Sequence, residues 1–220
     1  DSGGRPVMAI AATKNSAAKE NEDSARGKLI ETASRIMREG DTIDISFSEL
    51  SVLSGLNSAL VKYYFGNKDG LLEAILARDM DNILVQVGLL IKKDMPPEDK
   101  LRHHIGAVID TYYEFPYLNR LTMRLIRDLP PEGARSIADK YLKPLSQAYN
   151  IFVGEGIKSG VFRDVNPDFF YSSVTGAADR FFTGRLVWKY CYGRGDFNDN
   201  VRDSYREHTV DLIMAGILKP

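Results

Sequence analysis

Proline and glycine divide this sequence into stretches in which apolar residues recur at the spacing of an α-helix, and this punctuation is the strongest constraint on its fold. Apolar residues three and four positions apart line one side of a helix, whereas a half-buried strand alternates at every second residue. Such alternation is confined to short runs such as 42–46, which we interpret as a connector. The chain is therefore predicted to be all-α, with breaks at 95–97, 115–116, 130–131, 160–166 and 193–197.

The expected helices follow from these breaks. They cover 25–39, a short helix from 46 that ends before Gly55, a second short helix from 57 to 64, and then 69–93, 97–114, 117–129, 132–159, 167–190 and 198–218. Pro144 lies inside one of them, and we expect a kink or a division there because proline lacks the N–H that a helix interior uses. Residues 1–23 show no such periodicity and are expected to form a flexible N-terminal arm.

The composition is that of a globular protein. With 220 residues, 44% of them hydrophobic and 27% charged, the chain is neither collagen-like nor wholly disordered. The longest charge-free runs, such as 144–154, are far shorter than the ~20 apolar residues of a membrane-spanning helix. Cys191 is the single cysteine, and no secretory signal opens the sequence. We therefore expect a cytoplasmic protein with no membrane partner.

The charge balance gives no overall sign of nucleic-acid binding. The 29 Lys and Arg residues face 30 Asp and Glu residues, for a net charge of -1. Any such function must therefore rest on a local patch that neutralises phosphates. Residues 24–38 offer one, since Glu31 is the only acidic residue there beside Arg26, Lys28, Arg35 and Arg38.

Residues 46–65 are predicted to form two short helices joined by a tight turn. Ser46 and Glu49 stand three apart, an arrangement in which each side chain accepts a hydrogen bond from the other's backbone N–H at a helix start. Gly55 then ends the first short helix, and Asn57 caps the second. A short helix, a tight turn and another short helix make up a helix-turn-helix.

The second short helix has two different faces. Residues three or four apart share a face, so the residues expected to pack inward are Leu60, Val61 and Tyr64. The outward face then carries Ser58, Ala59, Lys62 and Tyr63. Small residues at the beginning of this face would let the helix enter the ~12 Å wide major groove of DNA, while a lysine and a tyrosine hydroxyl at its end would reach phosphates.

On these residues the segment SFSELSVLSGLNSALVKYYFGNKDGLL, residues 46–72, resembles the DNA-binding signature of the TetR/AcrR family of transcriptional regulators. The matching features are the helix start at Ser46, the turn glycine Gly55, the cap Asn57, the aromatic pair Tyr64-Phe65 and the helix start Lys68-Asp69-Gly70-Leu71-Leu72. The signature covers about the first third of the chain. The remainder resembles the family in length, in helical content and in ending on a long amphipathic helix.

The resemblance implies an N-terminal three-helix DNA-binding domain over 24–70 and a C-terminal helical ligand-binding and dimerisation domain over 71–220, with the helix at 69–93 as the lever between them. It also implies that the positions of Arg26 and Lys68 lie near DNA phosphates. The predicted DNA-binding residues are Arg26, Ser46, Ser48, Asn57, Ser58, Ala59, Lys62, Tyr63 and Lys68. The chain departs from the family at 58–60 and at 62, so the resemblance does not fix which bases are read.

The resemblance further implies a homodimer on a pseudo-palindromic double-stranded DNA operator, acting as a repressor under the control of a small-molecule effector. For an internal pocket that takes an apolar or aromatic effector we expect Tyr112, Met123, Phe181 and Trp188, with Asp179 or Arg180 as a polar anchor. A side of small residues on the helix from Pro167, with part of the last helix, is expected at the dimer interface: Ser172, Thr175, Gly176, Asp179, Thr183, Val201, Tyr205, His208 and Leu212.

The alternative is an all-α enzyme, or a protein-interaction scaffold with a helix-turn-helix-like module. No nucleophile elbow, phosphate loop or paired-carboxylate spacing points to catalysis, so we expect no enzyme, although a dispersed site stays open. His103 and His104 are adjacent in a helix and point about 100° apart, which favours solvated histidines over a metal site. We expect no metal and no cofactor. Arg194-Gly195-Asp196 is expected to form a turn.

Overall fold

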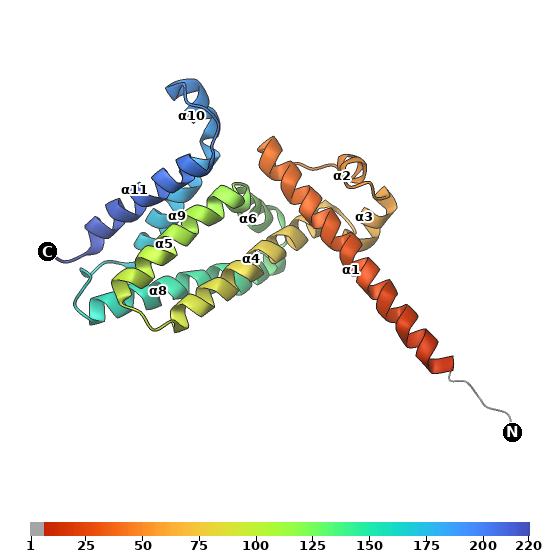
Figure 1. Cartoon of the computed structure of the whole chain (residues 1–220), viewed down its shortest axis with the longest axis horizontal. Coiled ribbons are helices and arrows are strands. Elements are labelled where there is room, and N and C mark those ends of the chain that lie inside the picture. The colour runs from red at the N-terminus through yellow and green to blue at the C-terminus, as the bar shows by residue number, and fades with distance from the viewer. Residues whose placement is uncertain (1–6) are drawn as a thin grey trace. The chain divides into compact units, whose positions relative to one another are not determined.

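The computed structural model describes the backbone of residues 7–220 and the side chains from Ser24 onward. Within that part the chain is helical and holds no strand, apart from an isolated antiparallel bridge between Phe162 and Leu218 (Figure 1). The all-α prediction is confirmed. The helices form two compact units, the first ending at Ile75 and the second spanning Leu76–Pro220, whereas the sequence analysis places the division after residue 70.

The first unit contains α1 (Val7–Gly40), α2 (Phe47–Ser54), α3 (Ser58–Phe65) and the beginning of α4 (Lys68–Lys92). The first three of these helices pack against one another. Their shared core is fully buried and apolar, and it includes Leu29, Met37, Leu50, Val61 and Leu71. These are the residues that helical spacing places on the inner faces, so this unit buries the side of each helix that the sequence predicts.

The start of α1 differs from the prediction. The structure continues the helix back to Val7, which corrects the arm predicted for 1–23 over residues 7–23; residues 1–6 lie outside the described residues. This segment is rich in Ala, Lys and Glu, which have high intrinsic helix propensity. Apolar periodicity reports only a helix face that packs against something, so it gives no signal where propensity alone extends the helix.

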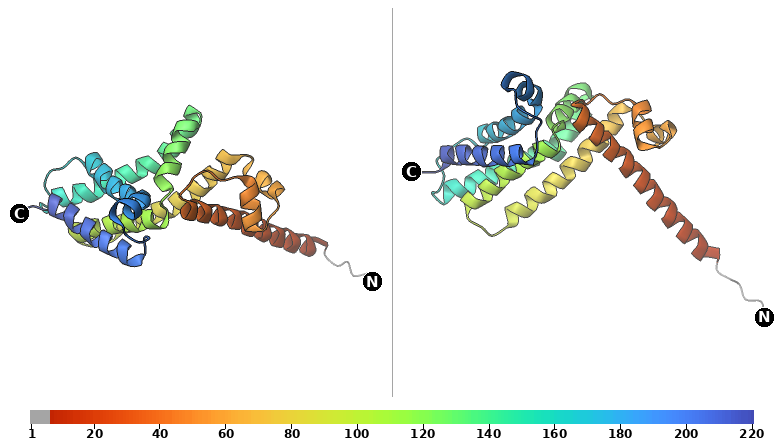
Figure 2. Two further views of the ribbon diagram at one scale, coloured as in Figure 1. Left: turned by 90° about the horizontal axis from the view of Figure 1, so that it is seen from above. Right: turned by 45° about the horizontal axis from the view of Figure 1, so that its top comes forward.

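The second unit contains the rest of α4 and the helices that follow it. These are α5 (Pro97–Glu114), α6 (Leu118–Asp128), α7 (Pro131–Ile137), a π-helical segment η1 (Ala138–Leu142), α8 (Lys143–Lys158), α9 (Pro167–Thr183), α10 (Arg185–Tyr192) and α11 (Asp199–Ile217). α5 is central, because α8, α9 and α11 all pack against it. Both views of Figure 2 show α11, in blue, running along α5.

Two of the expected long helices are divided. The structure divides the helix predicted at 132–159 at η1, just before Pro144, where a kink or a division was expected. Proline lacks the N–H that a regular helix uses, and the wider π-helical turn lies beside that position. The helix predicted at 167–190 is divided at Gly184, which ends α9 and donates its N–H to the carbonyl oxygen of Phe181 at 3.1 Å. A Cβ at Gly184 would lie only 2.8 Å from the Arg180 carbonyl oxygen. This division was not predicted.

Among the described residues, no helix is both long and apolar enough to cross a membrane.

Candidate nucleic-acid interface and internal cavity

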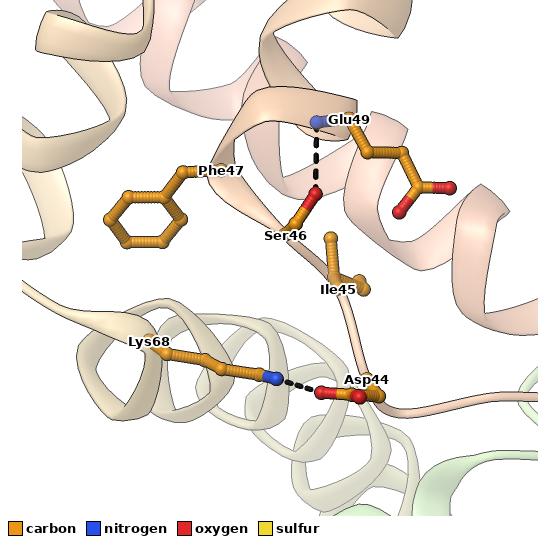
Figure 3. A pocket seen from close by; sticks show the side chains of 6 residues that line it. All are labelled: Asp44, Ile45, Ser46, Phe47, Glu49 and Lys68. Carbon is orange, nitrogen blue, oxygen red and sulfur yellow. Dashed lines mark hydrogen bonds and ion pairs between the residues drawn. The ribbon is translucent and has the colours of Figure 1, made fainter.

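The start of α2 is fixed by its first side chain. The backbone N–H of Glu49 donates to Ser46 Oγ at 3.0 Å, as Figure 3 shows. Ser46 itself has extended backbone angles, as a residue before the first helical turn should. The predicted helix start at Ser46 is therefore confirmed, and it leaves Ser46 and Ser48 both exposed.

The turn between α2 and α3 is held by two serines that the sequence analysis missed. Ser51 Oγ donates to the Leu56 carbonyl oxygen at 2.6 Å, and Leu56 N–H donates to Ser54 Oγ at 3.2 Å. Gly55 adopts φ 68°, the left-handed conformation that glycine tolerates without strain. Two serines just before a turn glycine were the available sequence signal, since such side chains compete for backbone groups at helix ends.

α3 presents the faces that its spacing predicts. Asn57 Oδ1 accepts from the N–H of Ala59 at 2.8 Å and so caps the helix. The inward side chains are Val61, which is buried, and Leu60 and Tyr64, which are half-buried. The outward face is exposed, with Tyr63 at 71% of its full exposure, and consists of Ser58, Ala59, Lys62 and Tyr63. The structure thus brings a small-residue start and a cationic, hydroxyl-bearing end onto one surface.

Two further cations flank α3. The guanidinium of Arg26, exposed on α1, lies 5.6 Å from the centre of the Phe65 ring, a cation–π arrangement that holds this charge beside the end of α3. Lys68 Nζ, at the start of α4, forms an ion pair with Asp44 (Figure 3). This pair was not predicted, and it gives Lys68 a carboxylate partner that would compete with a phosphate.

A shallow depression of about 370 Å³ lies beside the start of α2, and Figure 3 shows its lining. Besides the Asp44–Lys68 pair it contains Ile45, Ser46, Phe47 and Glu49. Two carboxylates on its wall disfavour an anion there, so we interpret the depression as the surface of the connector that joins α1 to α2 and not as a ligand site.

The second unit encloses a larger cavity of about 450 Å³, lined by residues of α4, α5, α6, α8 and α9 together with neighbouring connector residues. Tyr112 on α5 and Met123 on α6, both expected at an effector pocket, line it. Most of its wall is aliphatic or aromatic, including Ile83, Leu90 and Val108. A cavity of this size with a few polar groups has the properties of a small-molecule site.

Phe181 and Trp188 do not line this cavity, so their expected position is corrected. Phe181 stacks on Tyr205 with ring centres 3.6 Å apart, and it also contacts the rings of Trp188 and Phe197 at 5.4 Å and 4.9 Å. The reason is helical rotation: Thr175 lines the cavity, and six further residues at about 100° each turn Phe181 to a different side of α9. Trp188 lies beyond the division at Gly184.

Three titratable groups of the cavity wall, His104, Tyr112 and Tyr149, have shifted pKa values that keep them uncharged at pH 7. His104 is 3% exposed, and burial, followed by the neighbouring charge of His103, lowers its pKa to about 4. Burial likewise raises the pKa of Tyr112 and of Tyr149. Within the described part of the chain, His104 Nε2 and the Tyr149 hydroxyl have no hydrogen-bond partner. The expectation that both histidines are solvated is therefore wrong for His104 and correct for His103, which is exposed.

The expected polar anchors lie outside the cavity lining. Asp179 Oδ2 accepts from Asn119 Nδ2 at 2.9 Å, and Asn119 is the residue of this pair that lines the cavity. Burial raises the pKa of Asp179, although the hydrogen bond from Asn119 and the charge of Arg120 oppose the shift. Arg180 is exposed. The described residues also contain no group of three or more His, Cys, Asp or Glu side chains placed to hold a metal ion.

The residues predicted at a dimer interface fall into two sets. Thr175 lines the cavity, and Tyr205 is held inside the chain by its stack on Phe181 and by a 2.8 Å hydrogen bond from its hydroxyl to the Ala177 carbonyl oxygen. Asp179 is bound to Asn119, while Thr183 and Val201 are half-buried. The exposed members are Ser172, Gly176, His208 and Leu212. Of the residues predicted at the dimer interface, only these four are exposed on the surface of a single chain.

Comparison with known proteins identifies the family. Residues 94–220 match the family described as "Tetracyclin repressor-like, C-terminal domain", so the chain belongs to the tetracyclin repressor-like family. It is 26% identical over 100 residues to HTH-type transcriptional regulator BetI 1 of Chromohalobacter salexigens, a match that covers 45% of this chain and 48% of that protein. The chain thus spans about half the length of the curated relatives it matches.

Solved structures share the fold. The transcriptional regulator FadR from Bacillus subtilis, in complex with stearoyl-CoA, superposes with a TM-score of 0.64 at 16% identity and covers 86% of this chain and 97% of its own. A transcriptional regulator from Saccharomonospora viridis in complex with choline gives a TM-score of 0.68 at 16% identity, covering 90% of this chain and all 100% of its own. At these identities the likeness shows the fold alone.

Proposed function

We propose that this protein is a DNA-binding transcriptional regulator, a homodimeric repressor that a small-molecule effector releases from a pseudo-palindromic operator. The observation that carries the proposal is the exposed face of α3, held by the capped and serine-braced turn of a helix-turn-helix in a chain of the tetracyclin repressor-like family. Regulation of transcription fits a cytoplasmic protein that is not an enzyme, as expected for this family.

The surface of the first unit suits a DNA duplex. Ser58 and Ala59 keep the start of α3 narrow enough for the major groove, and Lys62 and Tyr63 carry the groups that reach phosphates. Arg26 lies beside the end of the same helix. Because the chain as a whole has a net charge of -1, this attraction is local and should weaken steeply with salt.

A homodimer would supply two such helices. The exposed Ser172 and Gly176 of α9, with His208 and Leu212 of α11, remain the candidate surface for a second copy. Two-fold symmetry would place the α3 helices in major grooves about 34 Å apart, or a multiple of that distance, which is why the operator is expected to be pseudo-palindromic.

The link between cavity and DNA runs through α4, whose residues up to Ile75 belong to the first unit and whose later residues belong to the second. On that helix Asp79 is 2% exposed and accepts a 2.8 Å hydrogen bond from the Tyr117 hydroxyl. Phe115 and Leu118, on either side of Tyr117, line the cavity. A ligand that binds more tightly when Phe115 and Leu118 have shifted would also move Tyr117, and thereby favour another position of α4. Coupling between two sites requires such a difference in affinity between two conformations.

The names of the similar structures do not fix the effector. One contains stearoyl-CoA, which carries phosphates, and another contains choline, which carries a quaternary ammonium. Ligands so different within one fold mean that the effector of this chain has to be inferred from its own cavity.

The proposal is tested with a DNA fragment from upstream of the protein's own gene. The parent protein should bind it with an affinity that falls as salt rises, and Lys62→Ala should lower the slope of log affinity against log salt by about 1, because one phosphate contact is lost. Lys158→Ala is the matched control, since Lys158 is also exposed but lies at the end of α8. An unchanged slope in Lys62→Ala would contradict the proposed DNA face.

A further inference from the structure

We propose that the cavity of the second unit takes an uncharged, mainly apolar molecule with a hydroxyl or carbonyl oxygen that bonds to His104 and Tyr149. This inference rests on the proposed function only in treating the cavity as the effector site. It adds the chemical class of the ligand, which neither the family nor the similar structures supply.

The cavity wall offers no carboxylate, ammonium or guanidinium among the described residues. Of the described residues that line the cavity, none is Lys, Arg, Asp or Glu. His103 lies on the exposed side, and His104 is neutral at pH 7 because burial holds its pKa near 4. A carboxylate, phosphate or ammonium inside would lose its hydration without gaining a counter-ion, and such burial is strongly unfavourable.

The half-buried carboxylate of Asp179 does not line the cavity. Its Oδ2 accepts a hydrogen bond at 2.9 Å from Nδ2 of Asn119, which does line it. Burial raises the pKa of Asp179, while the hydrogen bond from Asn119 and the charge of Arg120 oppose that shift. Asn119 therefore presents an uncharged amide to the cavity.

Two buried polar atoms of the cavity wall lack a hydrogen-bond partner among the described residues. His104 Nε2 and the Tyr149 hydroxyl are buried without a hydrogen-bond partner among the described residues, and both side chains line the cavity. Their rings meet edge to face with centres 4.8 Å apart, so the two groups belong to the same part of the wall. Buried polar groups are normally paired, and unpaired ones in a binding cavity mark where a ligand group would bond.

The pair suits a neutral oxygen. A phenol hydroxyl donates and accepts, and a neutral imidazole nitrogen does one or the other. A ligand hydroxyl would accept from one of them and donate to the other, and a carbonyl oxygen would accept from a donor. The remaining wall is mostly aliphatic or aromatic, as at Ile83 and Leu90, and includes uncharged polar side chains such as Asn119 and Thr122. The volume of about 450 Å³ lies in the range typical of small-molecule sites.

The test uses the full chain and three competitors that share a ten-carbon chain and carry an uncharged, an anionic or a cationic head group. N-phenyl-1-naphthylamine, an uncharged probe that fluoresces in apolar sites, is bound first and then displaced with 1-decanol, decanoate or decyltrimethylammonium, each below its micelle concentration. We expect 1-decanol to displace the probe at a concentration at least about tenfold lower than either charged head group, because only the charged heads are buried without a partner.

Three variants test the anchor. Tyr149→Phe removes the hydroxyl and His104→Phe removes both ring nitrogens, while each keeps a ring. Each variant should weaken 1-decanol binding by about twofold to tenfold. Tyr113→Phe is the matched control, since the Tyr113 hydroxyl bonds to Asp199 and Tyr113 does not line the cavity. Probe binding itself and a native circular-dichroism spectrum show that each variant is folded.

The outcomes separate this inference from the proposed function. Equal displacement by the three head groups, or a preference for a charged one, overturns the assignment of an uncharged ligand, as does unchanged 1-decanol affinity in both anchor variants. If the chain ranks the probes as expected but binds no DNA fragment, the ligand class stands and the proposed function fails. If the chain binds DNA but shows no preference for 1-decanol, the proposed function stands and the ligand class fails.

Discussion

The two units of this protein place their polar chemistry in opposite environments. In the first, the groups proposed to meet DNA are exposed side chains such as Lys62 and Tyr63, fixed by hydrogen bonds between residues close in sequence. In the second, two polar groups of the cavity wall, His104 and Tyr149, are buried and uncharged at pH 7, and they come from different helices. We therefore expect charge to dominate binding at the proposed DNA face, and the lack of charged side chains to dominate ligand choice at the cavity.

The largest effect expected from this contrast is a pH dependence in the second unit. The pKa of His104 is about 4 in the fold against 6.5 when solvated, so between these values the unfolded chain binds the extra proton. This contribution to stability is fully present above pH 6.5 and is lost as the pH falls toward 4, at a cost of about 3 kcal/mol. Urea unfolding followed by the fluorescence of Trp188, the only tryptophan, measures it.

His104→Phe removes this titration, so its unfolding free energy should change less between pH 7 and pH 4.5 than that of the parent. His103→Gln, on the exposed neighbour, is the matched control and should keep most of the pH dependence. Identical pH dependence in the parent and in His104→Phe would show that the buried site does not resist protonation, and the contrast between the units would then weaken.

A second prediction concerns the junction that presents α3. A Cβ at Gly70 would overlap the carbonyl oxygen of Phe65, the last residue of α3, so Gly70→Ala must displace backbone. We expect it to destabilise the first unit by about 1–3 kcal/mol, measured by circular dichroism, and to weaken DNA binding in parallel.

Gly88→Ala supplies the control on the same helix. A Cβ at Gly88 meets nothing within 4 Å, so this change should stabilise α4 by up to about 1 kcal/mol, because alanine is the better helix former. If both alanines had the same effect, the packing of α3 against the start of α4 would not be tight enough to orient the DNA face.

A third prediction addresses the connection between the two sites. Tyr117→Phe deletes the hydroxyl that bonds to Asp79, a contact worth about 1 kcal/mol. The factor by which saturating 1-decanol weakens DNA binding should then shrink by about fivefold, while each affinity measured alone stays near that of the parent. Tyr113→Phe should leave the factor unchanged. If 1-decanol weakens DNA binding by the same factor in Tyr117→Phe as in the parent, the signal reaches α4 through another contact.

The smallest expected effect tests the charge of the first site. Asp44→Asn releases Lys68 from its ion pair, and exposed pairs of this kind are worth about 0.2–1 kcal/mol, so affinity for the DNA fragment should rise by up to about fivefold. The increase should vanish in a Lys68→Ala background. Glu49→Gln removes another carboxylate of the same depression as a control. If the increase persists without Lys68, it reflects overall charge and not this pair.

The first unit was more predictable than the second for a physical reason. The helix start at Ser46, the cap at Asn57 and the faces of α3 follow from interactions within a few residues, which a sequence displays directly. Even there the Lys68–Asp44 pair escaped prediction, because its members are 24 residues apart. In the second unit Tyr112 and Met123, two of the residues predicted to bind an effector, line the cavity, whereas Phe181 and Trp188 do not.

The all-α class, most of the helix ends and the outward side of α3 could be predicted from the amino-acid sequence. These properties depend on periodicity, proline, glycine and local hydrogen bonds. The burial of His104, the stack of Phe181 on Tyr205 and a cavity lining without Lys, Arg, Asp or Glu among the described residues follow from tertiary packing. A cavity wall depends on the rotation of several helices at once, and a shift of one residue turns a side chain by about 100°, so local patterns cannot fix it.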